Sequence, residues 1–257
     1  TRHMETGLGG KVVLVTGGAG GIGQSICRKF SEEGAKVAVH FHTSSEEAES
    51  LAMEVGGMAF QADLRIPSQA DEMVSEIVSK MGGIDVCVAN SGSYPPEPRP
   101  MWEIDEERWN STIISNLGVS ANTSRAFLSH ASERGSGSLV LVGSTAGVYG
   151  EAGHSDYAAA KGAITTGLLL SLKNEVSRLG SVRVNAVAPG WTLTEKKVES
   201  GLEEAVMERA KSTMALKKLA TPNDVAMAII ALSSDEVSGH ITGQVIEVAG
   251  GMEGRLV

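Results

Sequence analysis

The run Lys11-Val-Val-Leu-Val-Thr16, followed at once by Gly17-Gly18-Ala19-Gly20-Gly21-Ile22-Gly23, decides the fold of this 257-residue chain. The first part is typical of a short β-branched strand, and the glycines end it. A helix pattern with one apolar face follows and stops at Gly34. Strand, glycine turn and helix in that order predict a dinucleotide site, because glycines let the backbone approach a pyrophosphate and the helix N-terminus offers free N–H groups. The glycines fit two registers, Gly18-x-Gly20-x-x-Gly23 and Gly17-x-x-x-Gly21-x-Gly23.

Strand and helix patterns alternate along the rest of the chain. The later strands are expected at residues 36–41, 58–62, 84–89, 138–143, 182–187 and 244–248. A long helix that Asp105 can cap should run to about Ser132, and a last helix should begin near Pro222. The alternation predicts an α/β fold with one doubly wound, parallel, seven-stranded sheet flanked by helices. We expect a single domain over residues 5–257, with a charged amphipathic segment at about 191–213 as a lid over the substrate.

Composition excludes several classes of partner. Formal net charge is -9, and the basic residues are scattered among acidic ones, so no nucleic acid is expected as a partner. No apolar run approaches the ~20 residues that span a bilayer, and no secretory signal opens the chain, so we expect no membrane association and a cytoplasmic location. Cys27 and Cys87 both lie in apolar patterns and are interpreted as small core residues, not as disulfide or metal ligands.

The segment Tyr157-Ala-Ala-Ala-Lys161 suggests acid/base chemistry. Residues four apart project from the same helical face, so the phenol and the ammonium should be neighbours. An ammonium beside a phenol favours the phenolate, which would let Tyr157 exchange a proton near neutral pH instead of near its ordinary pKa of ~10. Taken alone, the spacing also fits an ordinary pair on a helix surface.

The end of the second expected strand bears on the choice of dinucleotide. A carboxylate at this place binds the adenosine ribose hydroxyls of NAD. The sequence has His42-Thr43-Ser44 instead, which offers hydrogen-bond donors without a negative charge, and therefore favours NADP(H) while NAD(H) stays possible. No Arg or Lys occurs in this segment, and His42 also fits an ordinary surface histidine.

Further polar residues follow the carboxyl ends of other expected strands, where ligands bind in open parallel sheets. Asn90-Ser91-Gly92 comes after the strand at 84–89, and Ser144 comes after the strand at 138–143. The proline-rich segment Tyr94-Pro95-Pro96-Glu97-Pro98-Arg99-Pro100 suits neither helix nor central strand and is expected to overhang the substrate pocket. Asn116 lies among apolar positions of the long helix, where an Asn is usually a satisfied buried polar group.

From Lys11 to Gly251 the chain resembles the short-chain dehydrogenase/reductase family, which has a Rossmann-type fold. The matching segments are Thr16-Gly17-x-x-x-Gly21-Ile22-Gly23, Asp63-Leu64, Ala89-Asn90-Ser91-Gly92 and Pro189-Gly190-Trp191-Thr192-Leu193-Thr194. Asn116, Ser144, Tyr157 and Lys161 match the family's catalytic tetrad in order and context. The resemblance selects the second glycine register, and Ser91 departs from the alanine usual in the family.

The resemblance implies a role for each of these residues. Tyr157 would donate the proton to a carbonyl oxygen, Ser144 would hydrogen-bond the same oxygen, and Lys161 would lower the pKa of Tyr157 and hold the nicotinamide ribose. Asn116 would anchor a water that passes protons to Lys161. The cofactor-binding residues implied are Gly17, Gly21, Ile22, Gly23, His42, Thr43, Ser44, Asp63, Leu64, Asn90, Gly92, Tyr157, Lys161, Pro189, Gly190, Thr192 and Thr194.

The resemblance implies an NADP(H)-dependent oxidoreductase that interconverts a carbonyl and a secondary alcohol, and it leaves the substrate open. The segments 184–191 and 241–248 are most similar to 3-oxoacyl-[acyl-carrier-protein] reductases, which suggests a carrier-protein thioester docked on Arg134 and Arg178. A sugar or small-polyol dehydrogenase is the alternative, and a cofactor-binding regulator without catalysis is the non-enzymatic one. A homotetramer is also implied, packed through the two helices that contain Asn116 and Tyr157.

Overall fold

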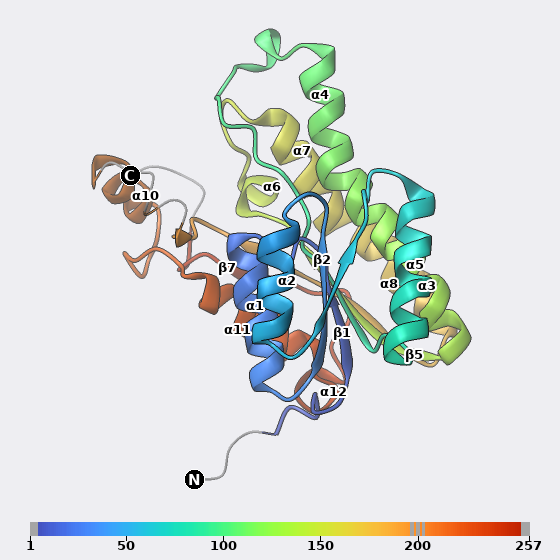
Figure 1. Ribbon diagram of the computed structural model, residues 1–257. Coiled ribbons are helices and arrows are strands. Elements are labelled where there is room, and N and C mark those ends of the chain that lie inside the picture. The colour runs from blue at the N-terminus through green and yellow to red at the C-terminus, as the bar shows by residue number, and fades with distance from the viewer. Residues whose placement is uncertain (1–4, 196–197, 199–200, 202–203, 253–257) are drawn as a thin grey trace.

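A seven-stranded, wholly parallel sheet forms the centre of the computed structural model, which describes residues 5–195, 198, 201 and 204–252 (Figure 1). The strand order is β3-β2-β1-β4-β5-β6-β7, so the predicted doubly wound sheet is confirmed. The strands are β1 (Val12–Val15), β2 (Lys36–Phe41), β3 (Met58–Gln61), β4 (Val86–Ala89), β5 (Ser136–Val142), β6 (Ser181–Pro189) and β7 (Val245–Val248). The order reverses between β1 and β4, and ligands of such sheets bind at the carboxyl ends of the strands beside that point.

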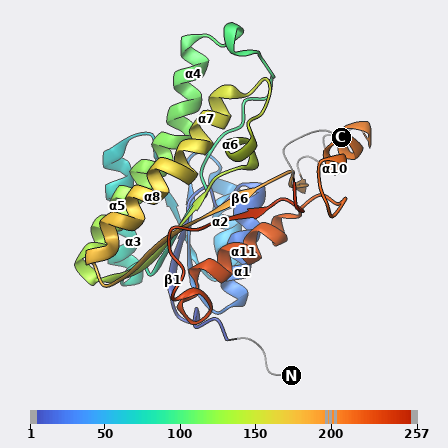
Figure 2. The ribbon, with the colours of Figure 1, turned by 180° about the vertical axis from the view of Figure 1, so that it is seen from behind.

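Helices cover both faces of the sheet (Figures 1 and 2). On one face lie α1 (Gly21–Glu32), α2 (Ser45–Glu54) and α11 (Pro222–Ser233). On the other lie α3 (Pro67–Met81), α4 (Glu106–Ile113), α5 (Val119–Arg134), α7 (Ser155–Ala163) and α8 (Leu169–Glu175). The shorter helices are α6 (Thr145–Tyr149), α10 (Glu204–Ser212), α12 (Asp235–Ser238) and the 3₁₀ turns Met101–Glu103 and Val176–Arg178.

The pleat of the strands divides the core in two. Val12 and Leu14 of β1 pack into the core under α3 and α5, whereas Val13 and Val15 pack into the core under α1 and α11. Both faces are covered, which explains why the strands are runs of apolar residues without polar alternation. The free cysteines are buried as expected, Cys27 in one core and Cys87 in the other, so the sheet separates them.

Two long helical rods carry an interruption of the same kind. The expected helix from Asp105 exists, and the Asp105 side chain accepts a hydrogen bond from the Arg108 backbone N–H at 2.8 Å. Between α4 and α5, however, residues Ile114–Gly118 form a π turn, and between α7 and α8 residues Ile164–Leu168 form another. Such wider turns occur frequently at functional sites, and no sequence pattern indicated them.

The expected lid lies only partly within the described residues. Positions 196–197, 199–200 and 202–203 fall outside them, as do residues 253–257 at the end of the expected domain. Helix α10 lies within the expected segment, and closure of that segment over a substrate stays a prediction. In the described part of the chain, no helix combines the length and the apolar character needed to cross a bilayer.

Candidate active site

A cavity of about 450 Å³ opens at the carboxyl ends of β4, β5 and β6. Its lining residues are Ile22, Asn90, Gly92, Ser93, Tyr94, Asn116, Val142, Gly143, Ser144, Thr145, Glu151, Tyr157, Lys161, Pro189, Gly190, Trp191, Thr192 and Thr194. All four residues that match the catalytic tetrad are among them. The sheet therefore brings together side chains that are up to 45 positions apart in the sequence, from Asn116 to Lys161.

The glycine loop beside this cavity has the shape that a pyrophosphate requires. Gly17 has φ +61°, a left-handed conformation that favours glycine. A Cβ at Gly23 would lie 2.1 Å from the Gly17 carbonyl oxygen, so the first turn of α1 can pack here only without a side chain. No side chain caps the N-terminus of α1, which leaves its first N–H groups for an anion. The loop thus fits a dinucleotide, in the register Gly17-x-x-x-Gly21-x-Gly23.

Asn90 fixes the glycine loop to the end of β4. Its backbone N–H donates to Thr16 Oγ1 at 2.9 Å, and its Nδ2 donates to the Thr16 carbonyl oxygen at 3.0 Å. The neighbouring Ser91 hydroxyl oxygen lies 3.2 Å from where a Gly17 Cβ would stand, and it is buried without a hydrogen-bond partner in the described structure. The small residue at 91 therefore permits the loop to approach this strand.

Asn116 lies in the π turn between α4 and α5 and holds the segment after β4. Its Nδ2 donates to the carbonyl oxygens of Ser93 at 2.8 Å and Thr112 at 3.0 Å, and its Oδ1 accepts from the Ser93 N–H at 3.2 Å. A Cβ on Gly92 would meet Asn116 Oδ1 at 2.7 Å and Lys161 Nζ at 3.2 Å. Asn116 Oδ1 and Lys161 Nζ thus lie close to the Gly92 backbone, and a side chain at position 92 would displace them.

Ser144 and Tyr157 are neighbours in the wall of the cavity. Ser144 caps α6, and its Oγ accepts from the Ala146 N–H at 3.1 Å. Burial raises the pKa of Tyr157, a hydrogen bond with Ser144 opposes the rise, and the negative charge of Glu151 adds to it. Tyr157 is therefore a protonated phenol at neutral pH, able to give a proton.

The expected acidification of Tyr157 by Lys161 is not what the structure has. Lys161 is buried, and its Nζ donates to the Val142 carbonyl oxygen at 3.0 Å while lying 5.8 Å from the centre of the Tyr157 ring. Desolvation lowers the pKa of Lys161 to about 8, because burial disfavours the charged form of the amine. The spacing of four residues predicted that the two side chains share one face of α7. It did not predict that both would be buried, which is the main cause of both pKa shifts.

The segment after β6 closes the cavity on the side of the glycine loop. Thr192 Oγ1 donates to the Gly190 carbonyl oxygen at 3.1 Å. Thr194 lies against α1, since a Cβ on Gly21 would come within 3.1 Å of its side chain. Gly190 is packed as closely, because its Cβ would stand 2.9 Å from the Ala249 Cβ. The expected nicotinamide segment is therefore in contact with the first turn of the glycine-loop helix.

Comparison with protein families settles what this architecture is. The family model of the short chain dehydrogenases matches residues 11–205, which include the glycine loop and all four residues of the tetrad. The chain belongs to the short-chain dehydrogenase family. It is therefore an oxidoreductase acting on CH–OH and carbonyl groups, of a family that uses a nicotinamide cofactor.

Individual members of the family are similar over nearly the whole chain. The 3-oxoacyl-[acyl-carrier-protein] reductase FabG of Thermotoga maritima is 36% identical over 253 residues, covering 95% of this chain and 98% of the relative. FabG of Chlamydia muridarum is 33% identical and covers 97% and 100%. FabG of Staphylococcus epidermidis is 32% identical and covers 94% and 98%. The similarity to 3-oxoacyl-[acyl-carrier-protein] reductases expected from two segments thus extends across the chain.

In this short-chain dehydrogenase the end of β2 carries a positive group that the linear sequence did not reveal. His42 Nε2 lies 3.7 Å from Asp63 Oδ2, and Arg65 binds both oxygens of Asp63 at 2.8 and 2.6 Å. The Arg65 hydrogen bond is the main cause that lowers the pKa of Asp63 to about 2. The segment 42–44 itself contains no Arg or Lys, as the sequence shows, but β3 pairs with β2 and brings Asp63, with Arg65 bound to it, next to His42. Thr43 and Ser44 are exposed beside them, and Leu64 is buried.

Glu151, a cavity residue of this short-chain dehydrogenase, and its neighbour His154 were not predicted from the sequence. Tyr94 stacks on His154 with ring centroids 4.4 Å apart and meets the edge of Tyr157 at 5.0 Å. The Tyr94 hydroxyl donates to Glu151, and His154 Nδ1 lies 3.2 Å from the same oxygen of Glu151. The proline-rich segment does overhang the pocket, as expected, and Tyr94 is the residue that it places there. The only signal was the position of Glu151 and His154 between Ser144 and Tyr157.

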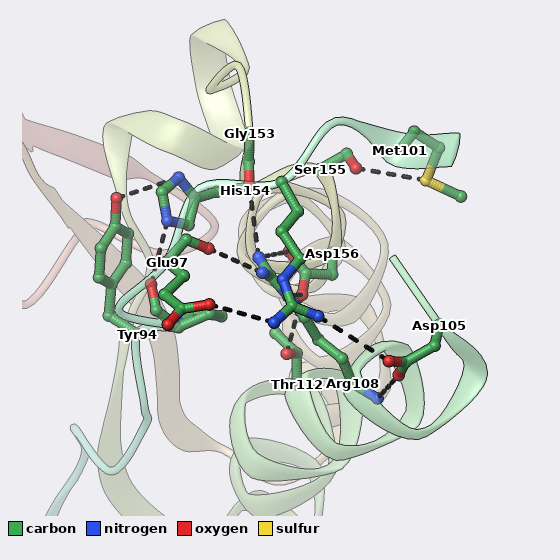
Figure 3. A network of polar contacts seen from close by, with 12 residues as sticks. Tyr94, Glu97, Met101, Asp105, Arg108, Thr112, Gly153, His154, Ser155 and Asp156 are labelled. Atoms are coloured by element: carbon green, nitrogen blue, oxygen red, sulfur yellow. Dashed lines mark hydrogen bonds and ion pairs between the residues drawn. The ribbon is translucent and has the colours of Figure 1, made fainter. Parts of the chain in front are cut away.

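An ion-pair network holds this rim together (Figure 3). Arg108 Nε donates to Asp156 Oδ2 at 2.9 Å, and the Thr112 hydroxyl donates to the same oxygen at 3.0 Å. Arg108 also donates to the carbonyl oxygens of Glu97 at 2.7 Å and Gly153 at 3.3 Å. One guanidinium thus joins α4, α7, the proline-rich segment and the loop before α7.

The proposed docking residues are not at this site. Arg134 ends α5 and Arg178 ends the turn after α8, and the strands that follow them, β5 and β6, begin there. Both arginines consequently lie at the amino ends of the strands, opposite the cavity. Arg134 also pairs with Asp85 at 2.9 Å, so the expectation of a basic docking patch built on these two residues was wrong.

Proposed function

We propose that this short-chain dehydrogenase is an NADP(H)-dependent enzyme that interconverts a carbonyl and a secondary alcohol, with Tyr157 as the proton donor. The observation that carries the proposal is the convergence of Ser144, Tyr157 and Lys161 on one cavity beside the glycine loop. A binding protein without catalysis has no need of a buried phenol and a buried ammonium at that place.

In the proposed reaction, residues of the chain donate one proton and stabilise the negative charge that develops on the carbonyl oxygen. A bound nicotinamide would supply the hydride. Tyr157, kept protonated by burial, donates its proton to the carbonyl oxygen, and Ser144 hydrogen-bonds that oxygen as negative charge grows on it. Lys161, whose pKa of about 8 leaves it charged at neutral pH, stabilises the phenolate left behind. Asn116 keeps the segment after β4 in place beneath them and would anchor the water that returns a proton to Lys161.

The cofactor would lie across the switch point of the sheet. Its pyrophosphate would meet the loop Gly17 to Gly23, and its adenosine end would meet Asp63, Leu64 and the segment 42–44. Its nicotinamide end would meet the remaining expected contacts, Asn90, Gly92, Tyr157, Lys161, Pro189, Gly190, Thr192 and Thr194. Helix α10 and the segment before it would close over the substrate as a lid of the single domain.

His42 and Arg65 favour NADP(H) over NAD(H). An arginine that neutralises Asp63, next to an imidazole, suits a 2′-phosphate better than a bare ribose hydroxyl. Steady-state reduction assays should give a kcat/KM for NADPH above that for NADH, and Arg65→Gln should lower the ratio about tenfold by removing one charged hydrogen bond. A preference for NADH in the unsubstituted enzyme, or an unchanged ratio in the variant, would contradict the assignment.

Relatives named as 3-oxoacyl-[acyl-carrier-protein] reductases support a 3-oxoacyl thioester as the substrate. A second class, small hydroxylated ketones and polyols, is favoured by Glu151, a carboxylate in the cavity wall. Initial rates with an acetoacetyl thioester and with a panel of hydroxyketones, each with both dinucleotides, decide between the two classes. If neither class reacts with either dinucleotide, the proposed function is wrong.

The assembly that we propose is a homotetramer. Helices α4–α5 and α7–α8 lie side by side and carry exposed apolar residues, among them Ile114 and Leu170, with 44% and 46% of their surface accessible. Burying such faces between copies of the chain would remove apolar surface from water.

A further inference from the structure

The cavity has an acidic wall on the substrate side of Tyr157 that the proposed reaction does not use. Among the lining residues that the structure describes, Glu151 is the one carboxylate. It lies on the loop between α6 and α7, with 36% of its side chain exposed. Its negative charge reaches Tyr157, whose pKa it raises. A carboxylate this close makes Tyr157 a weaker acid and therefore a poorer proton donor. Its presence in the cavity wall suggests a separate function for Glu151.

Two neighbours lie at one oxygen of Glu151. The Tyr94 hydroxyl donates to Oε1, and His154 Nδ1 lies 3.2 Å from Oε1 as well. Both interactions in the described structure reach the same atom. Oε2 is therefore the carboxylate oxygen left to accept a hydrogen bond from a molecule in the cavity.

The two neighbours are themselves fixed. His154 is buried, and since a carbonyl oxygen can only accept, its Nε2–H donates to the Pro95 carbonyl oxygen at 3.0 Å. Its stack on Tyr94 and the edge contact of Tyr94 with Tyr157 tie both rings to the proposed proton donor. The Arg108 network of Figure 3 fixes the loop and the proline-rich segment from behind. Glu151 is thus a preorganised acceptor, not a mobile surface acid.

We propose that Glu151 selects the substrate by accepting, at Oε2, a hydrogen bond from a hydroxyl or ammonium group next to the reacting carbonyl. This inference rests on the proposed carbonyl reduction and favours the second of its two substrate classes, the small hydroxylated ketones, to which it adds α-amino ketones. A ligand that places a carboxylate at this wall is rejected, because two negative charges would meet in a partly desolvated site.

Three ketones of equal skeleton test the proposal: aminoacetone, hydroxyacetone and butanone, which differ only in an ammonium, a hydroxyl or a methyl group. With the unsubstituted enzyme, kcat/KM should be about tenfold or more higher for the first two than for butanone, as expected for one hydrogen bond to a charged group. Glu151→Gln should lower the aminoacetone to butanone ratio about tenfold and change the hydroxyacetone ratio less, because an amide oxygen still accepts. Glu151→Ala should abolish both preferences.

Glu103→Gln is the matched control, since it removes one exposed acid outside the cavity lining and should leave both ratios unchanged. Equal kcat/KM values for the three ketones, or preferences that persist in Glu151→Ala, would overturn the proposal. Titration of the intrinsic tryptophan fluorescence, to which Trp191 in the cavity wall contributes, with the same ketones gives their dissociation constants without turnover. If the enzyme binds aminoacetone and hydroxyacetone more tightly than butanone, and Glu151→Ala loses this preference, the inference is supported. That holds even if no ketone is reduced, because absence of reduction contradicts only the proposed function. Equal binding of all three ketones would overturn the inference.

Discussion

His40, at the end of β2, shows how one residue behind the cavity holds the cofactor loop. Its Nε2–H donates to the Ala62 carbonyl oxygen at 3.0 Å, which leaves Nδ1 to accept from the Gly17 N–H at 2.9 Å. The bond from Gly17 requires a neutral ring, because a protonated Nδ1 cannot accept. Burial lowers the pKa of His40 to about 4, so the ring stays neutral at physiological pH.

This pKa gives folding stability a definite pH dependence. A histidine in the unfolded chain titrates near 6.5, so between 6.5 and about 4 the unfolded chain binds a proton that the folded chain does not. Stability therefore falls as pH is lowered through this window, by roughly 3 kcal/mol in all at 1.36 kcal/mol per pKa unit. Urea unfolding of the enzyme and of His40→Gln at both ends of the window should show this loss only when His40 is present. Parallel losses in the two proteins would contradict it.

At the scale of single residues, sequence predicted identities better than energies. Ser144 was noticed because it follows a strand, Tyr157 and Lys161 because they share a helical face, and Asn116 was assigned a role only through the family resemblance. The direction of the pKa shift of Tyr157 was wrong, since it depends on burial and on Glu151. Arg65 and Glu151 were not predicted because their relevance comes from strand pairing and loop packing.

Among the elements, the α4 and α7 rods matter most, because their contact sets the rim of the cavity. Asp156 precedes Tyr157 and is fully buried, and Arg108 is 13% exposed. Burial raises the pKa of Asp156, but the hydrogen bonds from Arg108, the Tyr157 N–H and Thr112 outweigh it, and the pKa ends below its ordinary value. The carboxylate is therefore charged and locks the first turn of the helix that carries Tyr157.

Asp156→Asn should weaken this lock. Removing one charge of a buried pair leaves Arg108 uncompensated, so the free energy of unfolding should fall by about 3 kcal/mol and kcat should fall with it. Denaturant unfolding and steady-state rates measure the two effects. Asp71→Asn is the matched control, since it breaks an exposed pair with Arg125 and should cost less than about 1 kcal/mol. Equal effects of the two substitutions would show that the buried Arg108–Asp156 network stabilises the protein no more than an exposed ion pair does.

Helices and strands were predictable from the sequence to within a few residues, but their irregularities were not. The cap Asp105 and the start of α11 at Pro222 are local signals, and both are where the sequence placed them. The π turns at Ile114–Gly118 and Ile164–Leu168 were not predicted, because an interruption of a single turn is too short to stand out in the apolar pattern of a rod.

For the whole molecule, the topology followed from the alternation of strand and helix patterns, since a parallel sheet covered on both faces is the common outcome of repeated βα units. The assembly did not follow in the same way. Exposed apolar residues on the two rods indicate a surface, and only the family resemblance suggested four copies.

Light scattering after size exclusion should therefore give a mass four times that of the chain. Leu170→Asp, which places a charge on an exposed apolar site of α8, should lower the mass to that of a dimer or monomer because a charge cannot be buried unpaired. Val237→Asp is a control of similar chemistry on α12, away from the two rods, and should leave the mass unchanged. A monomeric parent enzyme would rule out the tetramer.

Tyr157→Phe tests the central proposal most directly, because it removes one hydroxyl and keeps the ring that Tyr94 contacts. We predict that the variant binds NADPH within a few-fold of the unsubstituted enzyme, while single-turnover reduction of its best ketone slows by about 10²- to 10⁴-fold, the usual contribution of a positioned general acid. Reduction at a rate close to that of the parent enzyme would mean that another group gives the proton.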